Sequence, residues 1–346
     1  MTDEVKSDKQ KDETVCIGLD VGTMNICAAR SDLNDIKITR NVFMKVDDDN
    51  TDISELSDIN YITNEDGDIF IIGADAFTYS NIFGQKISRP MEKGLISPKE
   101  ISAIDVLTLM IKDLIGDVKS KECYCTFSSP AEAIDEGRSV TYHENVIGRI
   151  LKSFGVNYNS LNEAMAIIYA DCAKEKFSGI ALSFGAGMMN CVVAYRGVQA
   201  LSFSTSRSGD WIDREVASSL GLISNRVTSI KEKYMKLKGG SKVKNKKTKR
   251  VLEALYYYYK SLIEYTIKKI IKEFDEKVDV EIDEPLVIVI GGGTSIPEGF
   301  VDMFKDIISS YELPFDVSET RRASNPLTSV ANGLLIKTKA DVKGMK

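Results

Sequence analysis

The 346-residue sequence has little of what several classes of protein require. It holds a single histidine, His143, which excludes a histidine-based metal cluster or catalytic dyad. No apolar run approaches the roughly 18 residues needed to cross a bilayer, and residues 1–13 are polar, without the hydrophobic stretch of a signal peptide. These absences predict a protein without membrane insertion, whose residues 1–13 form a disordered tail.

Cysteine usage and net charge exclude further classes. Most of the six cysteines lie in apolar patterns, where cysteine acts as a small hydrophobe, and Cys123 and Cys125 lack the spacing and partners of a zinc site. Reduced thiols favour a cytoplasmic location. A net charge of −6 does not imply general affinity for nucleic acid or anionic membranes.

One local exception to this charge balance is a basic run. Residues 242–250 hold six basic side chains, which form either a patch for nucleic acid or an acidic partner, or a solvated loop between two helices. Charge runs favour the solvated loop. The four tyrosines at 256–259 cover all sides of a helix, which favours core and subunit packing over base stacking.

Strand-like and helical runs alternate along the chain, which predicts an α/β protein of about two domains. Residues 16–30 form an apolar hairpin, and residues 178–197 repeat its order of strand, glycine turn and strand. This repeat suggests duplicated lobes around a cleft. The other elements expected in the first half are a strand over 38–46, a hairpin that turns at 66–67 and helices near 101–114 and 141–154.

Three glycine turns carry the functional signal. In the first, Asp20-Val21-Gly22-Thr23, a buried acid is costly unless it is paired or holds a cation, although ordinary hairpin turns have a similar composition. The others, Gly185-Ala186-Gly187 and Gly291-Gly292-Gly293-Thr294, also close apolar strands. Each turn offers unobstructed backbone N–H groups, which suit a nest for phosphate oxygens.

The order and spacing of these turns resemble the actin, sugar-kinase and heat-shock-chaperone superfamily. Within it the chain is most similar to the prokaryotic actin-like ATPases of the MreB, MamK and ParM type. Matching segments run in family order at 20–25, 89–96, 162–166, 209–213, 230–233, 291–295 and 325–333. The resemblance implies an actin-like α/β fold, in which two duplicated lobes with ribonuclease-H-like mixed sheets and flanking helices surround a nucleotide cleft.

The resemblance also implies domain boundaries and ligands. Lobe I would span 14–160 plus a C-terminal helix at about 325–340, and lobe II would span 161–324, with 211–289 as its helical upper subdomain. The implied ligands are ATP or ADP with Mg²⁺. The nucleotide contacts carried over are Gly22, Thr23, Met24, Asn25, Ser183, Gly185, Ala186, Gly187, Gly209, Asp210, Lys231, Glu232, Gly291, Gly292, Gly293 and Thr294.

Catalytic and metal roles follow from the same resemblance. Asp20 would face the cation and phosphates, and Glu163 would contact the cation through water or merely cap its segment. Magnesium fits because it takes a few carboxylates plus phosphates and keeps several waters. The residue that orients the attacking water would be Glu144, although the helix dipole alone favours an acid in a first turn. Asp135 and Glu136 are weaker candidates.

The second hairpin departs from the family pattern. Ser183 stands where an aspartate is usual, and Met188-Met189-Asn190 replace a usual Thr-Thr-Asp. A serine cannot hold a cation as a carboxylate does, although its hydroxyl can bind phosphate or a metal-bound water. This change leaves nucleotide binding intact and argues against rapid hydrolysis of ATP.

The family implies a filament that assembles head to tail under the control of ATP binding and slow hydrolysis, serving as a prokaryotic cytoskeletal or DNA- or organelle-positioning element. Its partners would be further copies of itself and an adaptor protein, with loops 47–60 and 236–250 available for contacts. A sugar kinase would need a catalytic aspartate near the cleft and a sugar pocket, for which the sequence offers no clear candidate. A heat-shock chaperone would need a peptide-binding domain after the nucleotide domain, so neither activity is expected. The alternative favoured by Ser183 is a non-polymerising actin-fold adaptor that binds ATP without efficient hydrolysis.

Overall fold

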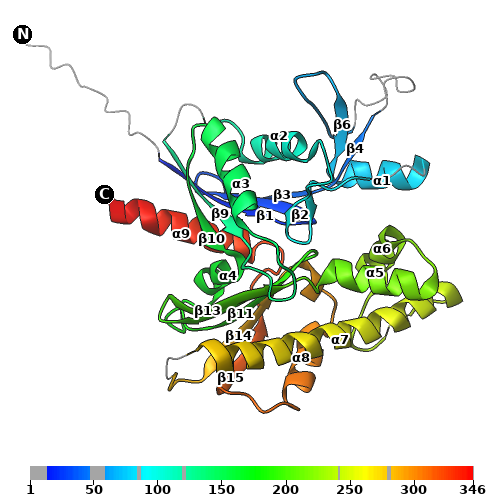
Figure 1. Cartoon of the computed structure of the whole chain (residues 1–346), viewed down its shortest axis with the longest axis vertical. Helices are drawn as coiled ribbons and strands as arrows, with labels where there is room; N and C mark the ends of the chain where they lie inside the picture. The colour runs from blue at the N-terminus through cyan, green and yellow to red at the C-terminus, as the bar shows by residue number, and fades with distance from the viewer. Residues whose placement is uncertain are drawn as a thin grey trace, which may run out of the picture.

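The computed structural model describes residues 14–46, 59–83, 87–118, 122–240, 242–278 and 282–345. The predicted tail at 1–13 and most of the acidic loop at 47–60 therefore lie outside the described residues. Figure 1 shows an upper and a lower body, here called lobe I and lobe II, with α4 (Glu163–Asp171) and α9 (Ser329–Met345) near their junction. Within the described ranges, no helix combines the length and apolar composition that a membrane span requires.

Lobe I is built on a five-stranded sheet in the order β10-β9-β1-β2-β3. The strand bounds are β1 Val15–Val21, β2 Asn25–Arg30, β3 Lys37–Arg40, β9 Cys123–Ser129 and β10 Asn157–Asn162. Alternate residues of β1 face opposite sides, as strand geometry dictates. Ile17 and Leu19 pack with α2 (Ala103–Ile115) and α3 (Thr141–Ser153), whereas Cys16 packs with α9.

Lobe II repeats this topology with a sheet in the order β13-β12-β11-β14-β15. The strand bounds are β11 Gly179–Phe184, β12 Met189–Tyr195, β13 Val198–Thr205, β14 Leu286–Gly291 and β15 Val317–Arg322. In each sheet the first strand pairs antiparallel with the second and parallel with a later one, so β11 corresponds to β1. The predicted α/β class and the repeat of strand, turn and strand are confirmed.

The predicted strand over 38–46 is wrong, because two strands of different sheets occupy it. β3 ends at Arg40, and the chain then turns into β4 (Phe43–Lys45) of a separate three-stranded sheet ordered β4-β6-β5. Asn41 holds this turn, because it is fully buried and its backbone N–H donates to Met24 O. The remaining elements beside this small sheet are β5 Tyr61–Thr63, β6 Ile69–Ile72, α1 Gly73–Phe83, β7 Met91–Glu92 and β8 Leu95–Ile96.

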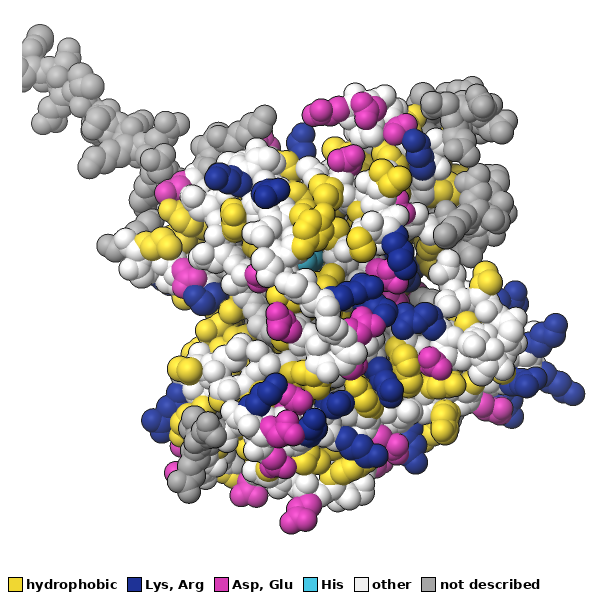
Figure 2. All heavy atoms as spheres, in the orientation of Figure 1, with side chains coloured by type: hydrophobic (Ala, Val, Ile, Leu, Met, Phe, Trp, Pro, Cys, Tyr) yellow, Lys and Arg dark blue, Asp and Glu magenta, His cyan; other side chains and the backbone are white. Residues whose placement is uncertain are grey.

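The helical part of lobe II contains α5 (Gly209–Leu220), α6 (Ser224–Tyr234) and the long α7 (Lys246–Lys277). The six basic residues of 242–250 are all exposed, in the loop before α7 and in its first turns. Figure 2 shows dark blue side chains gathered at the edge of the lower lobe where α7 begins. Beyond them, η2 (Gly293–Ser295) and α8 (Phe300–Ile308) follow β14, and α8 packs into the hydrophobic core that also contains residues of α5, α6 and α7.

Helix α9 packs directly against α4, and this contact depends on one glycine. A Cβ atom at Gly333 would lie 1.8 Å from the backbone oxygen of Ala166, far inside van der Waals contact. On either side of that glycine, Val330 and Leu334 join the core shared with α4 and the second sheet, whereas Leu335 packs toward the first sheet. The helix therefore holds both lobes together through a close backbone crossing.

Replacing Gly333 with alanine is expected to lower the free energy of unfolding by at least about 2 kcal/mol, because the backbone of α4 must move aside. Gly344→Ala is the matched control on the same helix, since nothing lies within 4 Å of the added Cβ there. Chemical denaturation of both variants tests this expectation. Equal stabilities for the two variants would show that α4 and α9 do not pack as closely as described.

Candidate functional site

A cavity of about 560 Å³ lies between the two lobes. It collects most of the site residues that the sequence predicts, from segments far apart in the chain. The predicted residues that line it are Asp20, Gly22, Thr23, Met24, Asn25, Glu163, Ser183, Gly185, Ala186, Gly187, Asp210, Lys231, Glu232, Gly292, Gly293 and Thr294. The predicted residues Gly209 and Gly291 do not line the cavity, but they lie directly beside residues that do.

The two hairpins that meet at this cavity have the same turn geometry. Gly22 N–H donates to Asn25 O at 3.0 Å, and Gly185 N–H donates to Met188 O at 3.0 Å. Each turn closes an antiparallel pair at the corresponding place in its sheet, β1 with β2 and β11 with β12. The duplication of the sheets therefore delivers two equivalent glycine turns to opposite walls of one cavity.

Strand register shows that Ser183 occupies in lobe II the position that Asp20 occupies in lobe I. Asp20 pairs with Cys27 across the first hairpin, and Ser183 pairs with Asn190 across the second. Each lies two residues before the turn glycine that donates the hydrogen bond. One wall of the cavity thus presents a carboxylate, whereas the equivalent position of the other wall presents a neutral hydroxyl.

Asp20 and Glu163 form a pair of half-buried carboxylates. Asp20 accepts a hydrogen bond from Ser128 Oγ at 2.9 Å, while burial raises its pKa to about 6. Burial, together with the charge of Asp20, raises the pKa of Glu163 to about 8. Within the described part of the chain, neither acid is paired with a lysine or arginine. Two desolvated oxygen ligands without a cationic partner suit a hard divalent cation.

Asn190 is a site residue whose role the sequence did not predict. It is fully buried, its Nδ2 donates to Glu163 Oε2 at 2.9 Å, and its Oδ1 accepts from Ala131 N at 3.0 Å. The Ser183 side chain forms a second hydrogen bond to Glu163 and lowers its pKa in part. The departures in the second hairpin therefore hold Glu163 in place. The hydrogen bond from Gly185 to Met188 closes the turn, and two residues outward from each of them Ser183 pairs with Asn190.

Two glycines are required by the close approach of other backbone segments. A Cβ at Gly187 would lie 2.4 Å from Gly94 N, in the turn between β7 and β8, and 2.4 Å from Thr23 Oγ1. Gly292 has φ +86°, a backbone conformation that favours glycine, and a Cβ there would lie 2.3 Å from Phe184 O. The first glycine thus allows the two lobes to touch beside the cavity.

Ion pairs join the two lobes beside the cavity. Arg40 of lobe I pairs with Glu232 of α6, and Arg89 of lobe I pairs with Asp210 of α5 at 2.9 Å, so both pairs cross from lobe to lobe. The sequence indicated Arg89 only through the matching segment 89–96, and nothing in the local pattern marked Arg40. Such partners are invisible before folding because they lie more than 100 residues apart.

The structure does not bring Glu144 to the cavity. It lies half-buried in the first turn of α3, and it is not among the residues that line the space between the lobes. Asp135 and Glu136 do not line it either, because Asp135 accepts from Tyr265 Oη at 3.0 Å and Glu136 pairs with Lys93. Among these acids and Glu163, the one at the cavity is Glu163.

Comparison with known families now identifies the chain. The family model described as Volactin matches residues 15–338, nearly the whole sequence. The chain belongs to the Volactin family. No curated protein sequence matches this Volactin-family chain.

Solved structures share its fold at low sequence identity. A MamK double helical filament is 16% identical with a TM-score of 0.69, and the match covers 94% of this chain and 99% of MamK. MreB5 of Spiroplasma citri bound to ADP is 17% identical with a TM-score of 0.63, over 96% and 99% of the two chains. The ethanolamine utilization protein EutJ from Carboxydothermus hydrogenoformans is 15% identical with a TM-score of 0.52, over 93% and 89%. The resemblance to prokaryotic actin-like proteins and the actin-like fold are confirmed.

Proposed function

We propose that this Volactin-family protein binds ATP or ADP with Mg²⁺ between its lobes and assembles head to tail into filaments under the control of that nucleotide. The observation that carries the proposal is the pair of equivalent glycine turns on opposite walls of one cavity, which the carboxylates of Asp20 and Glu163 also line. Two backbone nests suit a chain of phosphates, and the carboxylates suit its cation. The MreB5 and MamK structures bound to ADP or AMPPNP support a nucleotide as the ligand.

Asp20 and Glu163 would hold the cation, either directly or through its waters. When bound, magnesium neutralises phosphate charge and orients the phosphates for attack by water. In this role Glu163, not Glu144, is the residue that orients the attacking water, because it lies at the cavity and Asn190 fixes its carboxylate. Ser183 places a neutral hydroxyl at the position equivalent to that of Asp20, so we expect slow hydrolysis.

Self-assembly is the proposed consequence of nucleotide binding. A contact between different surfaces of identical subunits that does not close produces a filament. Ligand binding between hinged lobes changes the shape of the subunit and therefore its contacts. The MamK filament among the solved structures supports a second copy of the chain as the main partner. All six cysteines are buried free thiols, which supports a place in the reducing cytoplasm.

High-speed pelleting and negative-stain electron microscopy test the proposal, with ATP-Mg²⁺, ADP-Mg²⁺ and no nucleotide as the three conditions. We expect filaments with ATP-Mg²⁺ and a smaller pelleted fraction in the other two conditions. Calorimetric titration of the same nucleotides measures binding independently of assembly. A chain that binds no nucleotide would contradict the proposal at its first step.

One specific observation favours a second function, because the neutral Ser183 occupies a position equivalent to that of Asp20. In this alternative the protein is an actin-fold adaptor that binds ATP, hydrolyses it inefficiently and does not polymerise. Tight nucleotide binding without polymer under any of the three conditions would support the adaptor over the filament.

A further inference from the structure

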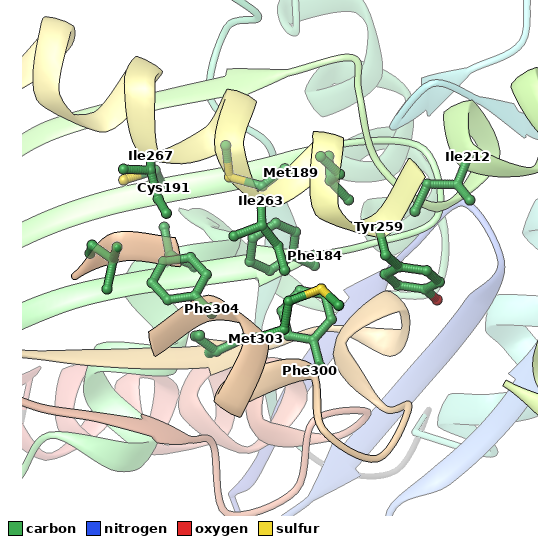
Figure 3. Close-up of a cluster of buried hydrophobic side chains, with 14 of the residues drawn as sticks. Phe184, Met189, Cys191, Ile212, Tyr259, Ile263, Ile267, Phe300, Met303 and Phe304 are labelled. Atoms are coloured by element: carbon green, nitrogen blue, oxygen red, sulfur yellow. The ribbon is translucent and has the colours of Figure 1, made fainter. Parts of the chain in front are cut away.

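Helix α7 is the longest helix that the structure describes, and it spans lobe II. Its 32 residues rise about 1.5 Å each, so its two ends lie about 48 Å apart. Figure 1 shows α7 crossing the lower lobe from the right edge to the left. Figure 3 shows Tyr259, Ile263 and Ile267 of α7 in one core with Phe300 and Phe304 of α8. The middle of the helix is therefore fixed in the core, and its ends are held at opposite edges of the lobe.

The first end of α7, with the loop before it, is strongly basic. Its lysine and arginine side chains are all exposed, and none has an ion pair with another described residue: Lys242, Lys244, Lys246, Lys247, Lys249 and Arg250. Bases at a helix N-terminus oppose the helix dipole, and Lys246 also repels Lys249 and Arg250 one turn later. No acid stands in the first turn to offset them. Residues 242–250, here called the basic end, therefore suit a negative partner better than they suit the stability of α7.

The other end of lobe II is acidic. The last turn of α7 and two nearby loops carry exposed acids that have no ion pair within the described ranges: Asp275, Asp283, Glu284, Glu312 and Asp316. The lysines in the last two turns of α7 do not neutralise them, because Lys272 pairs with Glu276 and Lys277 pairs with Glu273. These five acids are here called the acidic end.

Two contacts join the three segments that carry these acids. The rings of Phe274 in α7 and Phe315 in the loop before β15 have centroids 4.9 Å apart. Leu286, which directly follows the segment 283–285, donates its backbone N–H to Asp316 O at 2.8 Å. The acids therefore share one edge of lobe II. The helix dipole of α7 adds to the negative potential there, and it adds to the positive potential at the basic end.

We propose that the basic end of one copy of this chain contacts the acidic end of the next copy. This inference rests on the proposed function, because it names the two surfaces of the head-to-tail contact. The surfaces are opposite in charge and lie at opposite edges of one lobe, so each contact leaves one surface of each kind free and the assembly does not close. A net charge of −6 argues against nucleic acid at the basic end, since the chain as a whole repels it.

Charge reversal at each end tests this contact by pelleting with ATP-Mg²⁺. The basic-end variant carries Lys246→Glu with Lys249→Glu, and the acidic-end variant carries Glu312→Lys with Asp316→Lys. We expect each variant alone to raise the critical concentration for assembly at least about 10-fold, because like charges then face each other. An equimolar mixture of the two variants should assemble near the wild-type concentration, because each reversed end then meets its complement.

Neither unfolding nor loss of nucleotide explains such a result. An acid in the first turn of α7 favours the helix, so the basic-end variant should melt at or above the wild-type temperature. Calorimetric titration should give both variants the wild-type affinity for ATP-Mg²⁺. Lys260→Glu with Lys268→Glu is the matched control, because it makes the same charge change at exposed positions in the middle of α7. This control should assemble as the wild type does.

Other outcomes overturn the inference. If the reversed variants assemble at the wild-type concentration, or if their mixture does not assemble, the two ends do not meet, and the filament itself still stands. If the wild type binds a labelled single-stranded DNA oligonucleotide and the basic-end variant loses that binding but still assembles, the basic end serves nucleic acid. If the wild type binds ATP but never pellets, the inference fails together with the filament, and nucleotide binding remains. If it binds no nucleotide, the proposed function fails at its first step.

Discussion

Replacing Asp20 with alanine is expected to lower the Mg²⁺-dependent affinity for ATP at least about 100-fold, or roughly 2.7 kcal/mol, and to abolish nucleotide-dependent assembly. Asp20 supplies the carboxylate at the first hairpin, and Ser183 supplies none at the equivalent position of the second. The other acids at the cavity are occupied, since Asp210 pairs with Arg89 and Glu232 with Arg40. Glu298 pairs with Lys236, so of the acids that line the cavity in the described part of the chain, Glu163 alone would remain to hold the cation. Calorimetric titration with and without EDTA measures the loss.

The expected loss of ATP affinity in Asp20→Ala does not come from unfolding, and the melting temperature of the variant tests this. Because burial raises the pKa of Asp20 to about 6, the charged carboxylate is unfavourable in the chain without a cation. Asp20→Ala should therefore melt at or above the wild-type temperature at pH 8. Asp20→Asn is a further control that keeps the side-chain volume but removes the charge. Wild-type affinity for ATP-Mg²⁺ in either variant would refute the role of Asp20 in cation binding.

Replacing Glu163 with glutamine is expected to slow ATP hydrolysis about 100-fold, since a positioned general base contributes about 10²–10⁴ in rate, and to weaken Mg²⁺-dependent ATP binding less than Asp20→Ala does, because the amide oxygen can still contact the cation or its waters. The glutamine is nearly isosteric and retains an oxygen that can accept from Asn190, but it cannot take a proton from water. Phosphate release under saturating ATP measures the rate. Filaments formed with ATP should persist longer in this variant.

Glu144→Gln is the matched control for that experiment. The sequence pointed to Glu144 for the same role, but the structure places it in the first turn of α3, away from the residues that line the cavity. Its substitution should leave the rate of phosphate release unchanged. A slow Glu144→Gln variant beside a normal Glu163→Gln variant would reverse the assignment and restore the interpretation drawn from sequence.

Glu163→Gln should also change how the stability of the folded chain depends on pH. Burial and the charge of Asp20 raise the pKa of Glu163 to about 8 in the folded chain, above its usual value near 4.5. Below about pH 4.5, Glu163 is protonated in both the folded and the unfolded chain, and its contribution to the free energy of unfolding is fully present. It is lost as the pH rises toward 8, because the unfolded chain ionises first. In EDTA, the wild-type melting temperature should therefore fall between pH 5 and pH 8, and Glu163→Gln should fall less.

Local sequence patterns predicted the duplicated lobes because one pattern, strand, glycine turn and strand, occurs twice. Strand, glycine turn and strand recur at 16–30 and 178–197, and the structure places them in equivalent positions of two sheets with the same strand order. The strand over 38–46 was wrong for a reason that the local pattern does not contain. The residue that breaks it, Asn41, is apparent only from its hydrogen bonds to the loop at 22–24.

Alone, the sequence determined the α/β class, the duplicated hairpins and most of the residues that line the cavity, because turns and apolar periodicity act over a few neighbouring residues. Tertiary structure alone decided that Glu144 lies away from the cavity and that Asn190 holds Glu163 beside it. These facts depend on packing between distant segments. The cost of burying a charge or a hydroxyl, and the partner that offsets it, exist only after the lobes have come together.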